Sequence, residues 1–413
     1  MRSTVAGTHV GQTWPRPLAR TVGSSGRGHR ACGGAVAAGS TAKPWPRGGS
    51  GPPHRVAAAV ESRPRGIRRW LLWPRRGGPG PRRNPVTTSD TLRRPPFDPE
   101  LAAVLSVIGE SLPPTLTPEM IPLMRETPMM LPLEQVLEGR PVTHDEFTVP
   151  GYEGAEIIVS VFRRTDHVTG GPAIFHIHGG GMVVGDRFFG VEACIEWVER
   201  YDAVVASVEY RLAPEHPDPV PVEDCYAGLQ WFVTQGEELG FDTSRVVVAG
   251  GSAGGGLSAG VALLCRDRGG PALIGQFLMC PMIDDRNETV SSHQYDGIGV
   301  WDRTSNDTGW DALLGDRRGT DDVSIYASPA RATDLSGLPP AFIDVGSAEV
   351  FRDEDVAYAT QIWADGGVAE LHVWPGGFHG FQMMGGAATV ARKSVEAQLD
   401  WLDRILGHVV DEA

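Results

Sequence analysis

From about residue 155 onward, short apolar runs alternate with longer helical segments, and this alternation constrains the fold more than any other feature of the sequence. The runs are β-branched or apolar and are mostly bounded by Gly, Pro or Asp, as strands are. They cover residues 155–162, 172–177, 203–209, 245–249, 275–280, 340–345 and 369–374. Helical segments lie between most of them, at residues 190–201, 221–236, 254–268, 353–365 and 388–407. The pattern predicts an α/β fold with a mostly parallel central sheet and helices on both faces.

The first 94 residues differ in kind from the rest. They hold 18 of the 37 Lys and Arg residues but only Glu61 and Asp90 of the 51 acidic residues, so their net charge is +16 and that of the remainder is −30. They are rich in Gly, Pro and Arg and lack apolar periodicity, so they cannot bury a core. We predict a disordered basic segment at residues 1–95, followed by one domain at residues 96–413. A mis-assigned start, with the true one near Val86, is preferred over a functional tail or a targeting peptide.

Charge and hydropathy also narrow the partners of the domain. Its strong acidity disfavours nucleic acid and anionic membranes, because like charges repel. No apolar run approaches the roughly 20 residues of a transmembrane helix, and no secretory signal is recognisable. We therefore expect a cytoplasmic protein without a stable membrane anchor, and homo-oligomerisation stays open. The five cysteines are unevenly spaced without a CxxC pair, which favours scattered reduced thiols over a disulfide framework or a zinc site.

A serine lies at the junction of a predicted strand and helix. Residues 246–256 read Val-Val-Val-Ala-Gly-Gly-Ser-Ala-Gly-Gly-Gly, which places a GxSxG motif with Ser252 at its centre, between Gly250 and Gly254. The glycines allow a sharp turn that exposes the serine oxygen at the start of a helix, as in a nucleophile elbow. A phosphate-binding turn is the alternative, but no Lys follows and neither common phosphate-loop pattern is present.

A second glycine-rich element precedes the serine by 74 residues. His178, Gly179, Gly180 and Gly181 follow the predicted strand at 172–177. Three consecutive glycines leave the backbone bare, so that its N–H groups can reach a substrate oxygen, as in an oxyanion hole. A metal site at His176 and His178 is disfavoured because no third ligand with typical zinc spacing lies nearby.

A serine nucleophile needs a base, and the base needs an acid that holds its tautomer. His379 lies in a loop after the last predicted strand, flanked by Gly and aromatic residues. Two candidates for the acid follow the preceding strand region, Asp344 and Glu349. We prefer Glu349 because it lies in the loop, whereas Asp344 falls within the predicted strand.

Together these motifs resemble the hormone-sensitive-lipase-like family of α/β-hydrolase esterases, bacterial branch. The resemblance rests on four blocks: His-Gly-Gly-Gly at 178–181, Tyr-Arg-Leu-Ala-Pro-Glu-His-Pro at 210–217, the elbow at 250–254 and Phe-His-Gly-Phe at 378–381. It implies an α/β-hydrolase fold with a helical cap, here expected at about 97–135 and 284–325.

The resemblance also implies roles. Ser252 would be the nucleophile, His379 the base, and the N–H groups of Gly180, Gly181 and Ala253 the oxyanion hole. Two positions depart from the family pattern, since Gly251 stands where Asp or Thr is usual and Glu349 where Asp is usual. Within residues 210–217 we expect Arg211 and Glu215 to form an ion pair that braces the oxyanion loop.

The sequence therefore predicts a serine carboxylesterase that hydrolyses short- to medium-chain esters of small molecules through an acyl-enzyme, without metal or cofactor. The apolar content of the expected cap, which includes Trp301 and several methionines, suits an acyl pocket. Two alternatives stay open: a non-catalytic ligand-binding member of the same fold, and a hydrolase acting mainly on amides or acetylated small molecules. The alcohol part of the substrate is not readable from the sequence.

Overall fold

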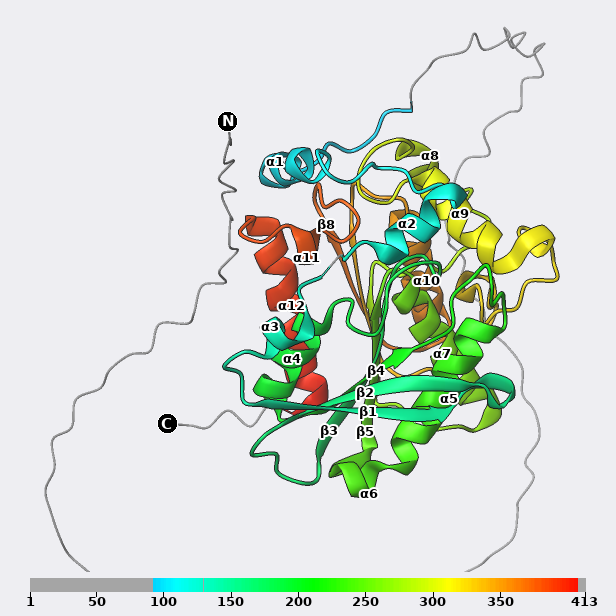
Figure 1. The fold of residues 1–413 in the computed structure, drawn as a ribbon. Coiled ribbons are helices and arrows are strands. Elements are labelled where there is room, and N and C mark those ends of the chain that lie inside the picture. The colour runs from blue at the N-terminus through cyan, green and yellow to red at the C-terminus, as the bar shows by residue number, and fades with distance from the viewer. Residues whose placement is uncertain (1–91, 129, 408–413) are drawn as a thin grey trace, which may run out of the picture. The chain divides into compact units, whose positions relative to one another are not determined.

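The computed structural model describes residues 92–128 and 130–407. An eight-stranded sheet forms the centre of this part of the chain (Figure 1), in the order β1-β2-β4-β3-β5-β6-β7-β8. The strands are β1 Val142–Pro150, β2 Glu156–Arg164, β3 Gly171–Ile177, β4 Val204–Glu209, β5 Phe241–Gly251, β6 Gly275–Met279, β7 Ala341–Gly346 and β8 Ala369–Trp374. The predicted basic segment falls almost entirely on residues outside the described ones.

Strand direction follows from the connections. β1 and β2 are joined by a short turn and pair antiparallel, and β2 also pairs antiparallel with β4. From β4 to the β8 edge the strands are parallel. Parallel neighbours need crossover connections, and these contain the helices that the sequence predicts. The carboxyl ends of β3, β5, β7 and β8 therefore meet at one edge of the sheet.

Helices cover both faces of the sheet. They are α1 Pro99–Ile108, α2 Ile121–Glu126, α3 Leu133–Leu137, α4 Val191–Tyr201, α5 Val220–Thr234, α6 Gly236–Leu239, α7 Ala253–Arg268, α8 Val290–Gln294, α9 Arg303–Leu314, α10 Arg352–Ala364, α11 Phe381–Met384 and α12 Thr389–Leu406. Short 3₁₀ turns lie at Pro118–Met120, Tyr152–Gly154, Gly315–Arg317 and Pro329–Arg331.

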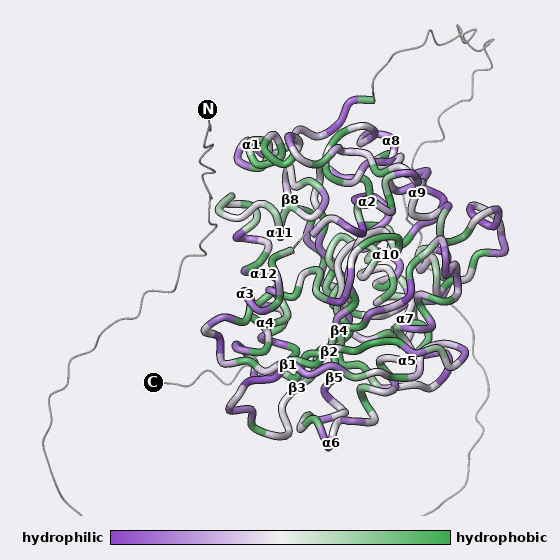
Figure 2. The backbone as a smooth tube through the Cα atoms, viewed as in Figure 1, coloured by the Kyte–Doolittle hydropathy of each residue, from purple (hydrophilic) through white to green (hydrophobic). Residues whose placement is uncertain are grey.

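Alternate side chains of each central strand enter different cores. Phe175 of β3 and Val248 of β5 pack with α5 and α7, whereas the adjacent Ile174 and Val247 pack with α4 and α12. Because successive strand residues point to opposite faces, a strand buried on both sides must be apolar throughout. Hydrophilic residues, purple in Figure 2, lie mostly in outer loops and at helix ends. No helix in the described ranges is long and apolar enough to span a membrane.

The α/β-hydrolase architecture predicted from the sequence is confirmed, and all seven predicted strands form. Within the first segment expected to form the cap, α1 begins after Asp98, whose carboxylate caps the helix by accepting hydrogen bonds from the N–H groups of Glu100 and Leu101. One strand was missed. β1 has four consecutive polar residues, Thr143 to Glu146, so it lacks the apolar run by which the other strands were found.

The two segments expected to form a cap contact each other. The N–H of Leu116 donates to Ser305 Oγ over 2.8 Å, and Thr308 Oγ1 donates back to the Leu116 carbonyl over 2.9 Å. Thr115 Oγ1 also donates to Asp302, the residue that caps α9. The segment that contains α2 is thus fastened to α9 by hydrogen bonds between residues almost 190 positions apart. That these elements act as a cap over the site stays a proposal.

Candidate active site

Ser252 lies in a sharp turn between β5 and α7. Its backbone has φ 55° and ψ −124°, a conformation that non-glycine residues rarely adopt. The flanking glycines are required by contact: a Cβ on Gly254 would lie 2.0 Å from the Ile177 carbonyl oxygen, and one on Gly250 would lie 2.4 Å from the backbone of Gly254. Gly251, in contrast, has room for a side chain, since a Cβ there would meet nothing closer than a Met279 side-chain atom at 3.6 Å.

Three side chains from the ends of different strands meet at this turn. The Nε2 atom of His379 lies 2.9 Å from Ser252 Oγ, and its Nδ1 atom lies 2.7 Å from a carboxylate oxygen of Glu349. The other oxygen of Glu349 accepts a hydrogen bond from the N–H of Gly346 over 2.8 Å. All three residues therefore form one hydrogen-bonded chain, in which a proton on Nδ1 leaves Nε2 free to accept from the serine. This is the arrangement of a serine, a base and an orienting acid.

Asp344, the alternative acid, points elsewhere. One of its oxygens accepts hydrogen bonds from Ser394 Oγ over 2.7 Å and from Gln398 Nε2 over 3.0 Å, both on α12. Burial raises the pKa of its carboxyl to about 6. The Asp344 side chain is thus held by a helix behind the sheet, and the contact to His379 is made by Glu349.

The glycine loop after β3 lies against the elbow. Gly180 and Gly181 have positive φ angles of 102° and 61°, and a Cβ on Gly179 would approach the Ser252 Cβ to 3.4 Å. Among the described residues, the N–H groups of Gly180 and Gly181 make no backbone hydrogen bond. Ala253 opens α7, where backbone N–H groups lack helical partners. The N–H groups of Gly180 and Gly181 are thus free of backbone partners in a loop that contacts Ser252 at Gly179.

His178 supports this loop through a ring stack and two hydrogen bonds. Its buried ring stacks on Tyr210 with centroids 4.2 Å apart, and its Nδ1 donates to the Gly179 carbonyl over 2.8 Å. The Tyr210 hydroxyl donates to the His178 carbonyl over 3.0 Å. The other histidine of the pair, His176, hydrogen bonds with Ser207 instead, and burial lowers its pKa to about 3. The two rings therefore have separate structural partners.

The predicted Arg211–Glu215 ion pair is wrong. Arg211 makes a two-pronged contact with Asp224, a fully buried carboxylate on α5, at 2.8 Å for each prong. Glu215 instead pairs with Arg125 of α2 over 2.9 Å. Both partners lie outside residues 210–217: Asp224 is 13 positions after Arg211, and Arg125 is 90 positions before Glu215.

Arg125 provides the brace that the ion pair was expected to give. Its Nε donates to the Val183 carbonyl and its Nη2 to the Ala213 carbonyl, both over 2.7 Å. It therefore joins α2 to the end of the glycine loop. The cavity of about 560 Å³ next to it is lined by residues of α2, α9 and the 214–215 turn.

Trp301, from the loop before α9, lies next to His379 and the glycine loop. Its ring centroid lies 6.5 Å from that of His379. A Cβ on Gly181 would come within 2.3 Å of the tip of its indole, so the indole rests directly on that glycine. Trp301 thus borders both the base and the glycine loop.

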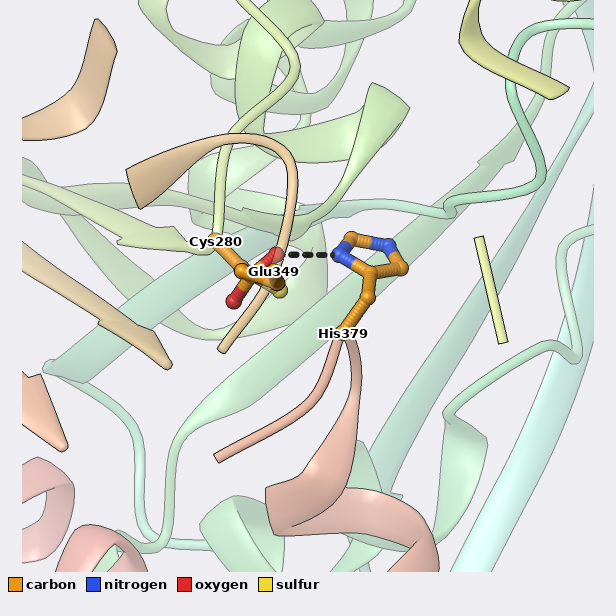
Figure 3. A group of neighbouring side chains, drawn as sticks. All are labelled: Cys280, Glu349 and His379. Carbon is orange, nitrogen blue, oxygen red and sulfur yellow. Dashed lines mark hydrogen bonds and ion pairs between the residues drawn. The ribbon is translucent and has the colours of Figure 1, made fainter. Parts of the chain in front are cut away.

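The four described cysteines, Cys194, Cys225, Cys265 and Cys280, are free and buried, as expected. Cys280 lies beside the site just described (Figure 3): its sulfur, a Glu349 oxygen and a His379 nitrogen all lie within 4.8 Å of one another. Within the described residues, no other group of three His, Cys, Asp or Glu side chains converges in this way.

The chain is similar in sequence to known esterases. Residues 174–383 match the model of a family described as having the alpha/beta hydrolase fold. The chain is 33% identical to the carboxylesterase NlhH of Mycobacterium tuberculosis over 304 residues, which cover 71% of this chain and 91% of that protein. It is 36% identical over 273 residues to the carboxylic ester hydrolase LipN of the same species, covering 63% of this chain and 71% of LipN.

Solved structures of esterases superimpose on this chain. A bacterial heroin esterase superimposes with a TM-score of 0.70 and 37% identity, covering 75% of this chain and 98% of that one. The esterase LipW of Mycobacterium marinum gives a TM-score of 0.67 at 30% identity, covering 76% and 98%.

Proposed function

The chain belongs to the hormone-sensitive-lipase-like family of α/β-hydrolase esterases, and on that premise we propose how its residues carry out the reaction. It is a serine carboxylesterase, in keeping with the carboxylesterases and esterases that it resembles over most of their length. The observation that carries the assignment of residues is the hydrogen-bonded chain from Ser252 through His379 to Glu349, assembled from segments up to 127 positions apart.

In the first half-reaction, Ser252 Oγ attacks the acyl carbon of the ester while its proton passes to His379 Nε2. The negative oxygen of the tetrahedral intermediate lies toward the N–H groups of Gly180, Gly181 and Ala253, and Glu349 balances the imidazolium. The ester bond then breaks, and Nε2 gives its proton to the leaving alcohol. Water repeats the sequence on the acyl-enzyme, which releases the acid and restores the serine.

The test of this proposal is the Ser252→Ala variant. It should lose p-nitrophenyl ester hydrolysis by on the order of 10⁶, because the nucleophile is gone. A fluorophosphonate probe should label the wild-type protein at Ser252 and leave the variant unlabelled. A substantial remaining rate would show that another residue is the nucleophile, and an unlabelled wild-type serine would favour the alternative of a non-catalytic ligand-binding protein.

We further propose a preference for short- to medium-chain acyl groups, from the position of Trp301. The indole lies on Gly181 and close to His379, so it narrows the space next to the reacting carbon. Trp301→Ala should therefore shift the optimum of a p-nitrophenyl acyl-chain series toward longer chains. Trp301→Phe, which keeps most of the volume, is the matched control and should shift it less. An unchanged optimum in both variants would place the acyl group elsewhere.

Other finer expectations stay predictions. A parallel panel of anilides and acetylated small molecules would reveal whether amides or acetates are better substrates than simple esters. We likewise propose a cytoplasmic protein without a nucleic-acid partner, and light scattering would measure its oligomeric state.

A further inference from the structure

We propose that Cys280, Glu349 and His379 form an inhibitory binding site for a thiophilic divalent cation such as Zn²⁺ or Cd²⁺. The inference rests on the proposed roles of Glu349 and His379 and adds a regulation of the same site. It starts from Figure 3, where a sulfur, a carboxylate oxygen and a ring nitrogen face one another, with all three ligand atoms within 4.8 Å of each other.

The three donors are of the types that Zn²⁺ prefers. Thiolate, imidazole and carboxylate bind it at about 2.0–2.3 Å, usually in tetrahedral geometry with a fourth ligand. Cys280 follows directly after β6, and the backbone N–H of this residue donates to the Asp344 carbonyl over 2.7 Å. The sulfur is therefore held at the carboxyl end of the sheet, from which the loops carrying Glu349 and His379 also emerge.

Gln382 offers a possible fourth metal ligand beside the sulfur. The amide nitrogen of Gln382, on α11, lies 3.6 Å from Cys280 Sγ. The amide oxygen of Gln382 is buried and has no hydrogen-bond partner among the described residues. Buried polar atoms of this kind are rare because leaving them unpaired costs free energy. A half-turn of the amide would present that oxygen to a cation at the sulfur.

The surroundings of the thiol are strongly acidic. Burial, followed by the charge of Glu349 and then of Asp344, raises the pKa of the Cys280 thiol well above its usual range. Asp355 on α10 also faces this region, and neither oxygen of its fully buried carboxyl has a hydrogen-bond partner in the described chain. A bound dication would favour the thiolate over the thiol, since its positive charge stabilises the thiolate and the neighbouring negative charge together.

Occupation of the site is incompatible with catalysis. Coordination of Glu349 and of the Nδ1 lone pair of His379 breaks the 2.7 Å hydrogen bond between them. The Nδ1 proton then resides on Nε2, which can no longer accept a proton from Ser252, and the thiol releases one proton to solvent. Two anionic ligands balance the dication. The bound enzyme is therefore held in the wrong tautomer for ester hydrolysis.

The experiment uses the purified full chain, stripped of metal with a chelator and then pre-incubated with Zn²⁺ or Cd²⁺. The pre-incubation is needed because a metal ion reaches buried side chains slowly. Hydrolysis of a p-nitrophenyl ester is expressed relative to the metal-free rate of the same variant. At a metal concentration ten times the dissociation constant, the wild-type rate should fall to roughly a tenth, and excess chelator should restore it. Cys280→Ala should need at least tenfold more metal. Cys265→Ala removes a buried thiol elsewhere and should match the wild type.

Three results would overturn the proposal: no inhibition of the wild type, equal inhibition of Cys280→Ala, or protection by Cys265→Ala. Cys280→Ser keeps the size of the side chain and guards against a folding defect in the alanine variant. Cd²⁺–thiolate absorption in the ultraviolet, present in the wild type and reduced in Cys280→Ser, reports the site without any turnover. Failure of the proposed function would remove the metal-free activity, whereas failure of this inference would leave that activity intact and remove only the metal effect.

Discussion

Replacing the orienting acid by its amide gives the sharpest test of the site. In Glu349→Gln, the side-chain oxygen can still accept from the Gly346 N–H, which leaves the NH₂ group facing His379 Nδ1 across what was a 2.7 Å contact. Two donors cannot face each other there, so Nδ1 becomes the acceptor and the ring proton moves to Nε2. The Nε2 atom then donates toward Ser252 Oγ, 2.9 Å away, and cannot take its proton.

The expected loss in kcat is on the order of 10⁴, as for the equivalent change in a chymotrypsin-type triad. That corresponds to about 5 kcal/mol of transition-state stabilisation. Glu349→Asp shortens the side chain by one C–C bond, about 1.5 Å, which takes the carboxylate out of hydrogen-bond reach unless its loop moves. We expect an intermediate loss for this variant.

The assay is the kcat of p-nitrophenyl ester hydrolysis, with the melting temperature of each variant as a folding control. Asp344→Asn is the matched comparison, because Asp344 is an equally buried carboxyl that contacts α12 instead of His379. It should keep most of the activity. A loss in Asp344→Asn as large as that in Glu349→Gln, or a Glu349→Gln rate within tenfold of the wild type, would refute the reasoning.

Two further predictions concern stability. Gly254→Ala places a methyl group 2.0 Å from the Ile177 carbonyl oxygen and should lower the free energy of unfolding by about 3 kcal/mol or more. In Gly251→Ala the methyl group lies 3.6 Å from the nearest atom, so the free energy of unfolding should change by less than about 1 kcal/mol. Urea unfolding measures both, and similar effects of the two substitutions would contradict the elbow geometry. Because the pKa of Asp344 is raised to about 6 in the folded state, its contribution to stability is present below about pH 4 and is lost as the pH rises through 6. The stability of Asp344→Asn relative to the wild type should therefore increase by about 2 kcal/mol between pH 4 and pH 7, and parallel pH curves would show that folding does not raise the pKa of this carboxyl.

Much of the fold could be predicted from the sequence because apolar strand runs and the helical segments between them are both local patterns. Strands buried on two faces must be apolar throughout, so their runs stand out, and the helices between them are of ordinary length. β1 was missed for the same physical reason. It pairs only with β2 at the edge of the sheet, so it is only partly buried and can hold four consecutive polar residues, Thr143 to Glu146.

Ser252 and His379, which the structure joins by a hydrogen bond, were picked out because each lies in an unusual local sequence, a turn that needs glycine or a glycine-rich loop after a strand. Partners that act through side-chain contact left no such trace. Arg211 was matched with Glu215, its neighbour in the sequence, although it pairs with Asp224, and nothing local linked Arg125 to the glycine loop.

What the sequence by itself determined was therefore the order of elements, the type of sheet and the residues of the nucleophile elbow. Tertiary structure alone decided which carboxyl faces His379, where the ion pairs form, and that Cys280 lies beside Glu349. These facts depend on side chains far apart in the chain, and their distances are fixed only when the sheet brings its strand ends together.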